Sequence, residues 1–210
     1  MHYASRPALE KLNMKKILYI LFAIAVLWFV FLRDNQVSLG PGVFAPNPPK
    51  QIKIRSPKII SFKGYSITPL RKFSIKAKIL SKRNYSFGRG SDLSPVDLAL
   101  GWGKMSDESI LDFIDISQSS RWYRWKTNNF PIPRKEIETN SANMHLIPSN
   151  KSVETLIKRS REGDIIELVG KLVKVKAKDG WHWTSSLTRD DTGNQACELI
   201  WVEIFKIHKI

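Results

Sequence analysis

The sequence predicts an α+β protein: a small antiparallel β-barrel or sandwich with short helices, preceded by one transmembrane helix. Three observations lead to this prediction. Residues 17–32 form a run of sixteen uncharged, mostly apolar residues. Residues 73–79 alternate apolar and polar side chains without a break, which is typical of a half-buried strand. Beyond Asp164, short strand-like segments follow one another with turn signals between them, as in small barrels and sandwiches.

Residues 14–33 are predicted to be a membrane anchor. With sixteen residues, the run 17–32 lies at the short end of the lengths that cross a bilayer. The flexible stems of Lys15 and Lys16 extend it. A cleaved signal peptide and a buried core helix are the alternatives. The run ends on the bulky residues 28–32, which do not fit the small residues of a signal-cleavage site, so a retained anchor is preferred.

Charge around the run predicts its orientation. One acidic residue, Glu10, precedes the run, against four basic ones: Arg6, Lys11, Lys15 and Lys16. This excess of positive charge favours a cytoplasmic N-terminus. We therefore expect residues 1–13 to be a cytoplasmic tail of a single-pass protein of a bacterial inner membrane, with its folded domain in the periplasm. The membrane is the first expected partner.

The part beyond the anchor divides into a tether and a domain. Residues 34–58 contain five prolines, which favour extended, semi-rigid chain, and are expected to form a Pro-rich tether. Residues 59–210 are expected to form an extracytoplasmic globular domain. The lone cysteine, Cys197, excludes an intrachain disulfide and is interpreted as a small core residue.

The same part carries a strongly positive charge. The chain has 34 basic and 19 acidic residues, of which five basic and one acidic lie in 1–33, leaving 29 against 18, or +11. Such a charge attracts anionic partners: an acidic envelope component, lipid head groups or nucleic acid. The simpler interpretation is a basic surface that keeps the domain soluble.

Capping signals predict three short helices. The Ser-Pro pair at 94–95 is typical of a helix start, and Ser106 is expected to cap a second helix. Ser149 or Asn150 is expected to cap a third, which Gly163 would end.

The C-terminal part is expected to be β-structure. Strands are predicted at 120–126 and then at 165–169, 172–177, 181–185 and 197–207. The order of strands, glycines and hairpin in this part resembles an OB-like barrel. Fold similarity alone implies no function.

The turn at 178–180 has two interpretations. With a two-residue loop, Lys176 lies beside Trp183, and lysines and tryptophans, Trp181 included, form one exposed platform for a base or a sugar. With a three-residue loop, Val175 pairs with Trp183 and both tryptophans enter the core. The size of the rings favours the second interpretation.

Residues 120–126 interleave cations and aromatic rings, which makes Arg121, Trp122 and Arg124 candidates for ligand binding, with Lys176, Trp181 and Trp183. The structural alternative is a strand with Trp122 on one face, the other rings buried on the opposite face, and solvated basic ends.

The best candidates for acid–base chemistry are His145, expected in a loop over 141–148, and Asp190 or Asp191. No nucleophile-elbow or zinc-protease motif accompanies them. A hydrogen-bonded loop histidine is the simpler interpretation, and the oxygen-rich segment 188–194 reads more readily as a turn than as a cation site. No metal site and no cofactor are expected.

Three segments, 93–103, 141–148 and 185–199, resemble a family of uncharacterised bacterial proteins with one N-terminal membrane span. No activity is established for that family, so the resemblance implies no site.

The function expected from these features is a tethered, non-catalytic binding or assembly module for an anionic envelope component or a protein partner. Two alternatives stay open. One is a hydrolase of an envelope polymer or phosphodiester that uses His145 with Asp190 or Asp191. The other is a nucleic-acid-binding domain that uses Arg121, Trp122, Arg124 and the lysine–tryptophan hairpin.

Overall fold

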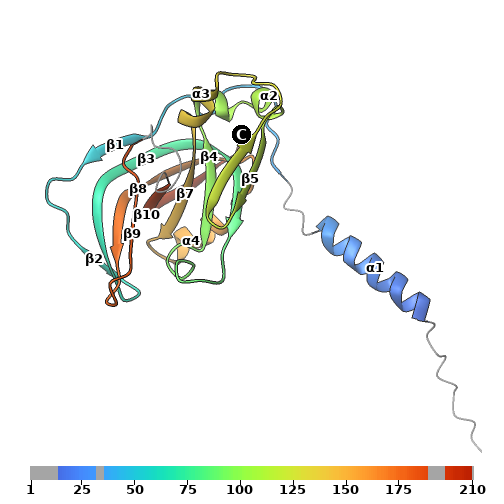
Figure 1. Ribbon diagram of the computed structural model, residues 1–210, viewed down its shortest axis with the longest axis horizontal. Helices are drawn as coiled ribbons and strands as arrows, with labels where there is room; N and C mark the ends of the chain where they lie inside the picture. The colour runs from blue at the N-terminus through green and yellow to red at the C-terminus, as the bar shows by residue number, and fades with distance from the viewer. Residues whose placement is uncertain (1–13, 32–35, 189–196, 210) are drawn as a thin grey trace, which may run out of the picture. The chain divides into compact units, whose positions relative to one another are not determined.

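The structure is a computed structural model that describes residues 14–31, 36–188 and 197–209 (Figure 1). The chain divides into two compact units, Met1–Asn35 and Gln36–Ile210. The described part of the first unit is the helix α1, Met14–Phe31. Within the ranges given above, no helix combines the length and the apolar character that a membrane crossing requires.

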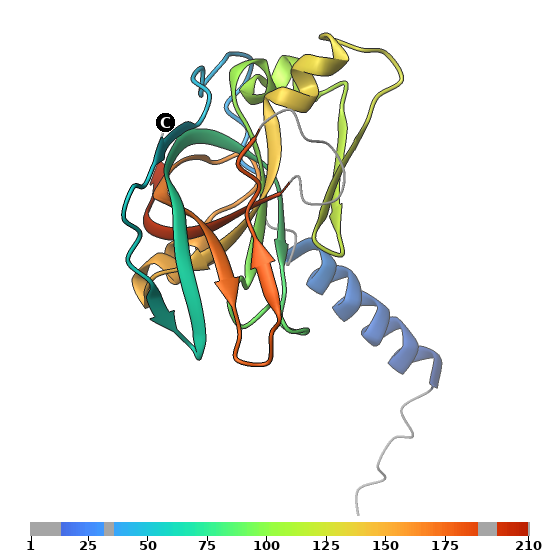
Figure 2. The ribbon, with the colours of Figure 1, turned by 60° about the vertical axis from the view of Figure 1, so that its left-hand side comes forward.

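The second unit is mostly β-sheet, organised around a closed ring of five strands (Figure 2). In ring order they are β3 (Tyr65–Asn84), β4 (Val96–Gly101), β7 (Ser141–Pro148), β10 (Glu198–His208) and β8 (Ile165–Lys176), which pairs back with β3. All neighbours in the ring are antiparallel except β7 and β10, which are parallel. The expected α+β class is confirmed. The prediction of a purely antiparallel sheet is wrong for the pair of β7 and β10.

Further elements extend and cover the ring. The paired strands outside it are β1 (Lys50–Lys53) and β2 (Ile60–Phe62) on β3, β9 (His182–Thr184) on β8, and a separate hairpin of β5 (Asp115–Ser119) and β6 (Trp122–Lys126). The short helices are η1 (Gly103–Ser106), α2 (Glu108–Leu111), α3 (Arg134–Thr139) and α4 (Lys151–Arg159).

The interior of the ring is an apolar core. Alternate residues of each strand point inward, as the alternation at 73–79 predicted, since successive side chains of a strand lie on opposite faces. They include Phe73, Ile75, Ala77, Leu98, Leu100, Met144, Leu146, Leu168, Ile200 and Val202. Each large aliphatic or aromatic side chain buried here contributes about 1.5–3 kcal/mol, so the ring is the stable frame on which other features are mounted.

Two smaller apolar clusters lie on the outer faces of the ring. One joins Ile67, Val175 and Trp201 and is covered by Trp181 and Trp183. The other lies between the ring and the β5–β6 hairpin; it includes Leu80, Ala99, Met105, Ile114 and Ile137, with Tyr123 and Trp125 packed against it. The hairpin therefore covers the outer face of β4 and β7.

Two expected elements have a different structure. The helix predicted to start at 94–95 does not form, because these residues lead into β4. The segment 141–148, expected to be a loop, is the strand β7. Every residue of both strands is buried. Residues 141–146 do alternate polar and apolar side chains, a strand signal that was overlooked, whereas the Ser-Pro-Val-Asp start of β4 imitates a helix cap.

The capping signal before α4 was read correctly. The Asn150 side chain accepts a hydrogen bond from the Val153 N–H at 3.0 Å, and Val153 and Ile157 are buried. The helix ends at Ser160, before Gly163. Gly163 is needed for another reason: a Cβ on this residue would lie 1.8 Å from the carbonyl oxygen of Val37.

Residues 36–45, here called the strap, are bound to the domain, so the tether predicted over 34–58 is wrong from Gln36 onward. The Val37 N–H donates to the Glu162 carbonyl at 2.8 Å, and the Gly103 N–H donates to the Ala45 carbonyl at 2.8 Å. After the strap, β1 pairs with β3. A proline-rich extended chain has no internal hydrogen bonds, and here its N–H groups find acceptors on the domain.

Glu108 of α2 collects most of the strap's remaining donors. Its carboxylate accepts from the Leu39 and Gly40 N–H groups at 2.8 and 2.7 Å, from the Ser38 hydroxyl at 2.8 Å, and from the buried Lys78 ammonium at 2.7 Å. Burial by itself would raise the pKa of Glu108, but these donors, Lys78 first, lower it to about 2. The charged carboxylate therefore holds the strap in place.

We expect Glu108→Gln to lower the free energy of unfolding by about 3 kcal/mol, because Lys78, with 2 % of its side chain exposed, would lose its charge partner. The control is Glu138→Gln, which breaks the exposed pair with Arg134 and is expected to cost less than about 1 kcal/mol. Urea denaturation at pH 7 measures both.

The same group predicts a pH dependence. Because the folded pKa of Glu108 lies below its ordinary 4.5, its stabilisation is present above about pH 4.5 and is lost as the pH falls toward 2. The wild-type chain should lose more stability over this interval than the Glu108→Gln variant. Parallel stability–pH curves for the two would contradict this role of Glu108.

Candidate functional site

Arg121 lies at the tip of the β5–β6 hairpin. Ser119 pairs with Trp122, so the loop consists of Ser120 and Arg121, whose φ angles are +50° and +65°. Two positive φ angles in a two-residue loop match the type I′ turn, which suits the twist of paired strands. The Arg121 N–H donates to the Tyr85 hydroxyl at 2.8 Å, and the Asn143 amide donates to the Arg121 carbonyl at 3.0 Å. Hydrogen bonds to both the backbone N–H and the backbone carbonyl of Arg121 therefore fix the tip.

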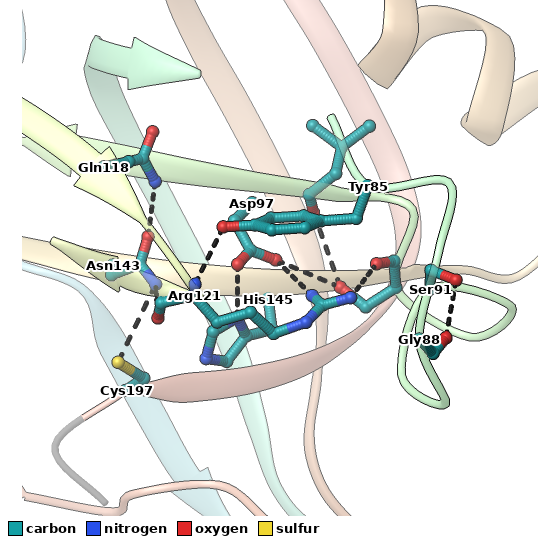
Figure 3. Close-up of polar contacts among 11 residues, drawn as sticks. Tyr85, Gly88, Ser91, Asp97, Gln118, Arg121, Asn143, His145 and Cys197 are labelled. Atoms are coloured by element: carbon teal, nitrogen blue, oxygen red, sulfur yellow. Dashed lines mark hydrogen bonds and ion pairs between the residues drawn. The ribbon is translucent and has the colours of Figure 1, made fainter. Parts of the chain in front are cut away.

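The Arg121 side chain reaches a fully buried carboxylate (Figure 3). Its guanidinium donates to Asp97 Oδ1 at 2.8 Å and to the Ser94 carbonyl at 3.0 Å. The guanidinium carbon lies 4.2 Å from the ring centre of Tyr85 and 5.3 Å from that of Trp183. Asp97 is 0 % exposed and Arg121 is 21 % exposed, so this ion pair is largely shielded from water and salt.

His145 is the second group on Asp97. Asp97 and His145 are directly opposite residues of β4 and β7, and Oδ2 of Asp97 lies 2.9 Å from Nδ1 of His145, an ion-pair contact without the alignment of a hydrogen bond. The His145 side chain is 4 % exposed. The sequence correctly singled out His145, but its carboxylate partner Asp97 was missed, because Asp97 lay in a segment expected to be helical.

The outer face of β7 continues this polar network under the hairpin. Gln118 donates to the Asn143 side-chain oxygen at 2.6 Å, and Asn143 contacts the Cys197 sulfur at 3.8 Å. One step further, the Tyr123 hydroxyl donates to Ser141 at 3.0 Å. Burial raises the pKa of Tyr123 to about 12, although Ser141 acts in the opposite direction. The phenol is therefore neutral and serves as a donor.

Four rings form a continuous series, here called the ring row: Tyr65, Trp181, Trp183 and His145. The distances between successive ring centres are 5.9, 6.2 and 4.7 Å, and the planes are inclined by 66°, 67° and 51°. The first three rings are half-buried. The guanidinium of Arg89 lies 5.0 Å from the ring centre of Trp181, and that of Arg121 lies over Trp183, so two cations accompany the row.

The hairpin that carries the two tryptophans adopts the three-residue loop. The Ala177 N–H donates to the Trp181 carbonyl at 2.8 Å, and Val175 pairs with Trp183. Lys176 pairs with His182 on the opposite face, where both are exposed. The favoured interpretation, a three-residue loop, is therefore confirmed, and the alternative platform of Lys176 with Trp181 and Trp183 does not form. Both rings turn toward the apolar cluster around Ile67 and are half-buried there.

A cleft of about 410 Å³ opens at the Tyr65 end of the ring row. Its charged and aromatic lining residues come from three turns and comprise Lys63, Tyr65, Arg89, Asp92, Lys178 and Asp179. Arg89 donates to Asp179 at 2.5 Å and lowers the pKa of that carboxyl. Tyr65 donates to Asp92 at 3.0 Å; burial, together with this bond, raises the pKa of the phenol.

The other predicted site residues are placed apart from the ring row or lie outside the described ranges. Trp122 and Arg124 alternate with Tyr123 and Trp125 on β6, and the latter two rings pack on the core as the structural alternative expected. Arg124 donates to the hydroxyl of Ser119 at 2.6 Å. Asp190 and Asp191 lie in 189–196, outside the described residues, so their pairing with His145 stays a prediction.

Sequence reasoning missed Tyr65, Arg89, Asp92 and Asp179 as site residues. The local signals were turns: Lys63-Gly64 before Tyr65, a Gly-Arg-Gly segment around Arg89, and the Asp-Gly turn at 179–180. Turn chemistry predicts where the chain reverses, but which turns meet depends on the ring. Among the described residues, no group of three or more His, Cys, Asp or Glu side chains is arranged to hold a metal ion.

Asp97 should be the most sensitive position of the polar network. We expect Asp97→Asn to lower the free energy of unfolding by about 3 kcal/mol or more, because the guanidinium of Arg121 would lose its charge partner in a buried setting. Asp92→Asn, at an exposed carboxyl, is the matched control and should cost less than about 1 kcal/mol. Equal midpoints of chemical denaturation for the two variants would contradict this ranking.

Comparisons with protein-family models, with curated proteins and with solved structures find no match for this chain. The resemblance of 93–103, 141–148 and 185–199 to a bacterial family with one N-terminal span therefore stays a prediction. Function has to be inferred from the ring row, its two arginines and the polar network beneath the hairpin.

Proposed function

We propose that this protein is a membrane-anchored, extracytoplasmic binding module for an envelope component, with the ring row as its ligand face. The observation that carries the proposal is the pairing of half-buried rings with guanidinium groups: Arg89 over Trp181 and Arg121 over Trp183. Rings offer apolar faces and arginines offer fixed, charged donors, which together suit a ligand with flat apolar surfaces and anionic groups.

The finer fold assignment belongs to this proposal: we infer an OB-type architecture. In chain order the ring strands are β3, β4, β7, β8 and β10, with the third and fifth parallel and a helix, α4, between the third and fourth. OB folds bind oligonucleotides and oligosaccharides with the face of their second and third strands and with two flanking loops. Here the hairpin covers that face, and Arg89 and Trp181 lie on the two corresponding connections.

The membrane anchor, also part of the proposal, is supported by the apolar run 17–32, of which α1 includes all but the last residue. Large apolar side chains of this helix are exposed, with Leu18 at 67 % and Phe22 at 70 %, and a helix that is apolar all round needs an apolar environment. The basic residues before it favour a cytoplasmic tail at 1–13 and a periplasmic domain in a bacterial inner membrane.

Photo-crosslinking in intact cells tests the binding function. A photoreactive residue replaces Lys178, which is exposed at the cleft, in the full-length chain. We expect it to capture an envelope component, with capture reduced at least tenfold when Trp181→Ala is added. The control places the same photoreactive residue at Phe113, an exposed ring outside the row. The same adducts from both positions, or none from Lys178, would contradict the proposal.

A second candidate function is hydrolysis of an envelope polymer or phosphodiester, and one observation favours it. Oδ2 of Asp97 lies 2.9 Å from Nδ1 of His145, and a carboxylate at this nitrogen is the usual partner of a general-base histidine, although the contact lacks the alignment of a hydrogen bond. Binding rather than hydrolysis is preferred because His145 is almost fully buried and the chain has no nucleophile motif around it.

The two functions predict different results in a turnover assay. For the binding module we expect the full-length protein to release no more p-nitrophenol from p-nitrophenyl acetate or bis-p-nitrophenyl phosphate than buffer does. His145→Ala should then leave this background unchanged. Turnover above background that His145→Ala abolishes would establish the hydrolase instead.

A further inference from the structure

We propose that the cleft at Lys63, Arg89 and Lys178 binds an acidic oligosaccharide, and that an anionic group of this ligand replaces Asp179 on Arg89. The inference rests on the proposed binding function, because it names the ligand class for one end of the same face. It follows from three features: an exchangeable ion pair, a ring beside it, and a mixed set of charges around it.

The ion pair of Arg89 and Asp179 marks a position for an anion. Oδ1 of Asp179 accepts from the Arg89 guanidinium at 2.5 Å and from the Trp181 backbone N–H at 3.2 Å. Two donors from different turns thus converge on a single oxygen. A carboxylate or phosphate of a ligand that replaces this oxygen finds both donors already oriented, and its hydrogen bonds to arginine are strong because both groups are charged.

The protein's own carboxylate can leave this position at small cost. The side chains of Arg89 and Asp179 are 43 % and 58 % exposed, and exposed ion pairs of this kind add little to stability. Arg121 and Asp97 provide the contrast, because Asp97 is 0 % exposed and cannot leave without uncovering a buried charge. The first pair is therefore exchangeable, and the second is structural.

The rest of the cleft suits a sugar. The half-buried ring of Tyr65 lines the cleft and offers an apolar surface to the C–H groups of a pyranose, while Trp181 packs edge-on behind it. The Asp92 carboxylate and the Lys178 ammonium add an acceptor and a donor for hydroxyl groups. The volume of about 410 Å³ lies within the range of small-ligand sites, roughly 300–1,000 Å³.

Nucleic acid fits this cleft less well. Base stacking uses rings with accessible parallel faces, whereas Tyr65, Trp181 and Trp183 are inclined to their neighbours by 66° and 67° and are half-buried. A sugar packs its C–H groups on a single ring face and needs no stack of parallel rings, so a glycan suits the inclined rings better.

Calorimetric titration of the full-length protein in detergent tests the assignment with three probes: hexagalacturonate, neutral maltohexaose and the oligonucleotide dT12. We expect hexagalacturonate to bind more tightly than the other two. Arg89→Gln should weaken its binding at least tenfold, because the anion loses its main donor. Asp179→Asn should tighten it severalfold, because the competing carboxylate is gone while the turn keeps its side-chain oxygen.

A second exposed pair supplies matched controls. Arg134 donates to Glu138 at 2.8 Å, and its guanidinium lies 5.7 Å from the ring centre of Trp125, so it repeats the charges and ring of the cleft elsewhere. Arg134→Gln and Glu138→Gln change the net charge by the same amounts as the cleft variants. We expect both to leave hexagalacturonate binding within twofold of wild type.

The results separate failure of this inference from failure of the proposed function. Tighter binding of dT12, equal binding of maltohexaose, or equal effects of the cleft and control variants would overturn the acidic-oligosaccharide assignment. If none of the three probes binds, the assignment is also overturned. In that case the crosslinking experiment decides whether the proposed binding function fails too. It fails only if the photoreactive residue at Lys178 captures nothing in cells.

Discussion

The fully buried carboxylate of Asp97 is the constraint on which the arrangement of the ring row depends. A charge without exposure to water has to be compensated, and the compensation comes from Arg121, across the β5–β6 hairpin, with His145 on the neighbouring strand. Because Arg121 also lies over Trp183, the same contact fixes a tryptophan of the ring row. Ring, hairpin and tryptophans are thereby held in one register.

Glu108 holds the strap at the N-terminal side of the domain, as Asp97 holds the hairpin beside the ring row. Its carboxylate gathers the donors of the strap and of Lys78, and so joins a proline-rich segment to the ring. In both places one carboxylate collects donors from segments that are distant in sequence: the strap and β3 for Glu108, and the hairpin tip for Asp97. These polar junctions specify where the segments dock, while the apolar ring supplies the stability.

The parts of the fold that the sequence predicted are those with local signals. Asn150 capped α4 because its side chain and the Val153 N–H are close in sequence, and the alternation at 73–79 was visible because one face of β3 is apolar. β4 was missed because its Ser-Pro-Val-Asp start imitates a helix cap, and β7 because the alternation over 141–146 was overlooked. The strap was missed because Leu39 finds its acceptor on Glu108, 69 residues away, and no local pattern encodes such a pairing. The site shows the same division: His145 and the tryptophans were found by residue type, whereas Asp97 and Arg89 became visible only once the ring brought distant turns together.

The left-handed conformation of Ser120 and Arg121 has a consequence for the order of folding. Each such residue without glycine's freedom costs roughly 1–2 kcal/mol, so the β5–β6 turn has little reason to form by itself. It becomes favourable when Arg121 pairs with Asp97 of β4 and when Tyr123 and Trp125 pack on the ring, and both contacts need the ring in place. We therefore picture the hairpin as a late-consolidating part of the domain, which locks onto a preassembled frame and is the first to loosen when that frame is disturbed.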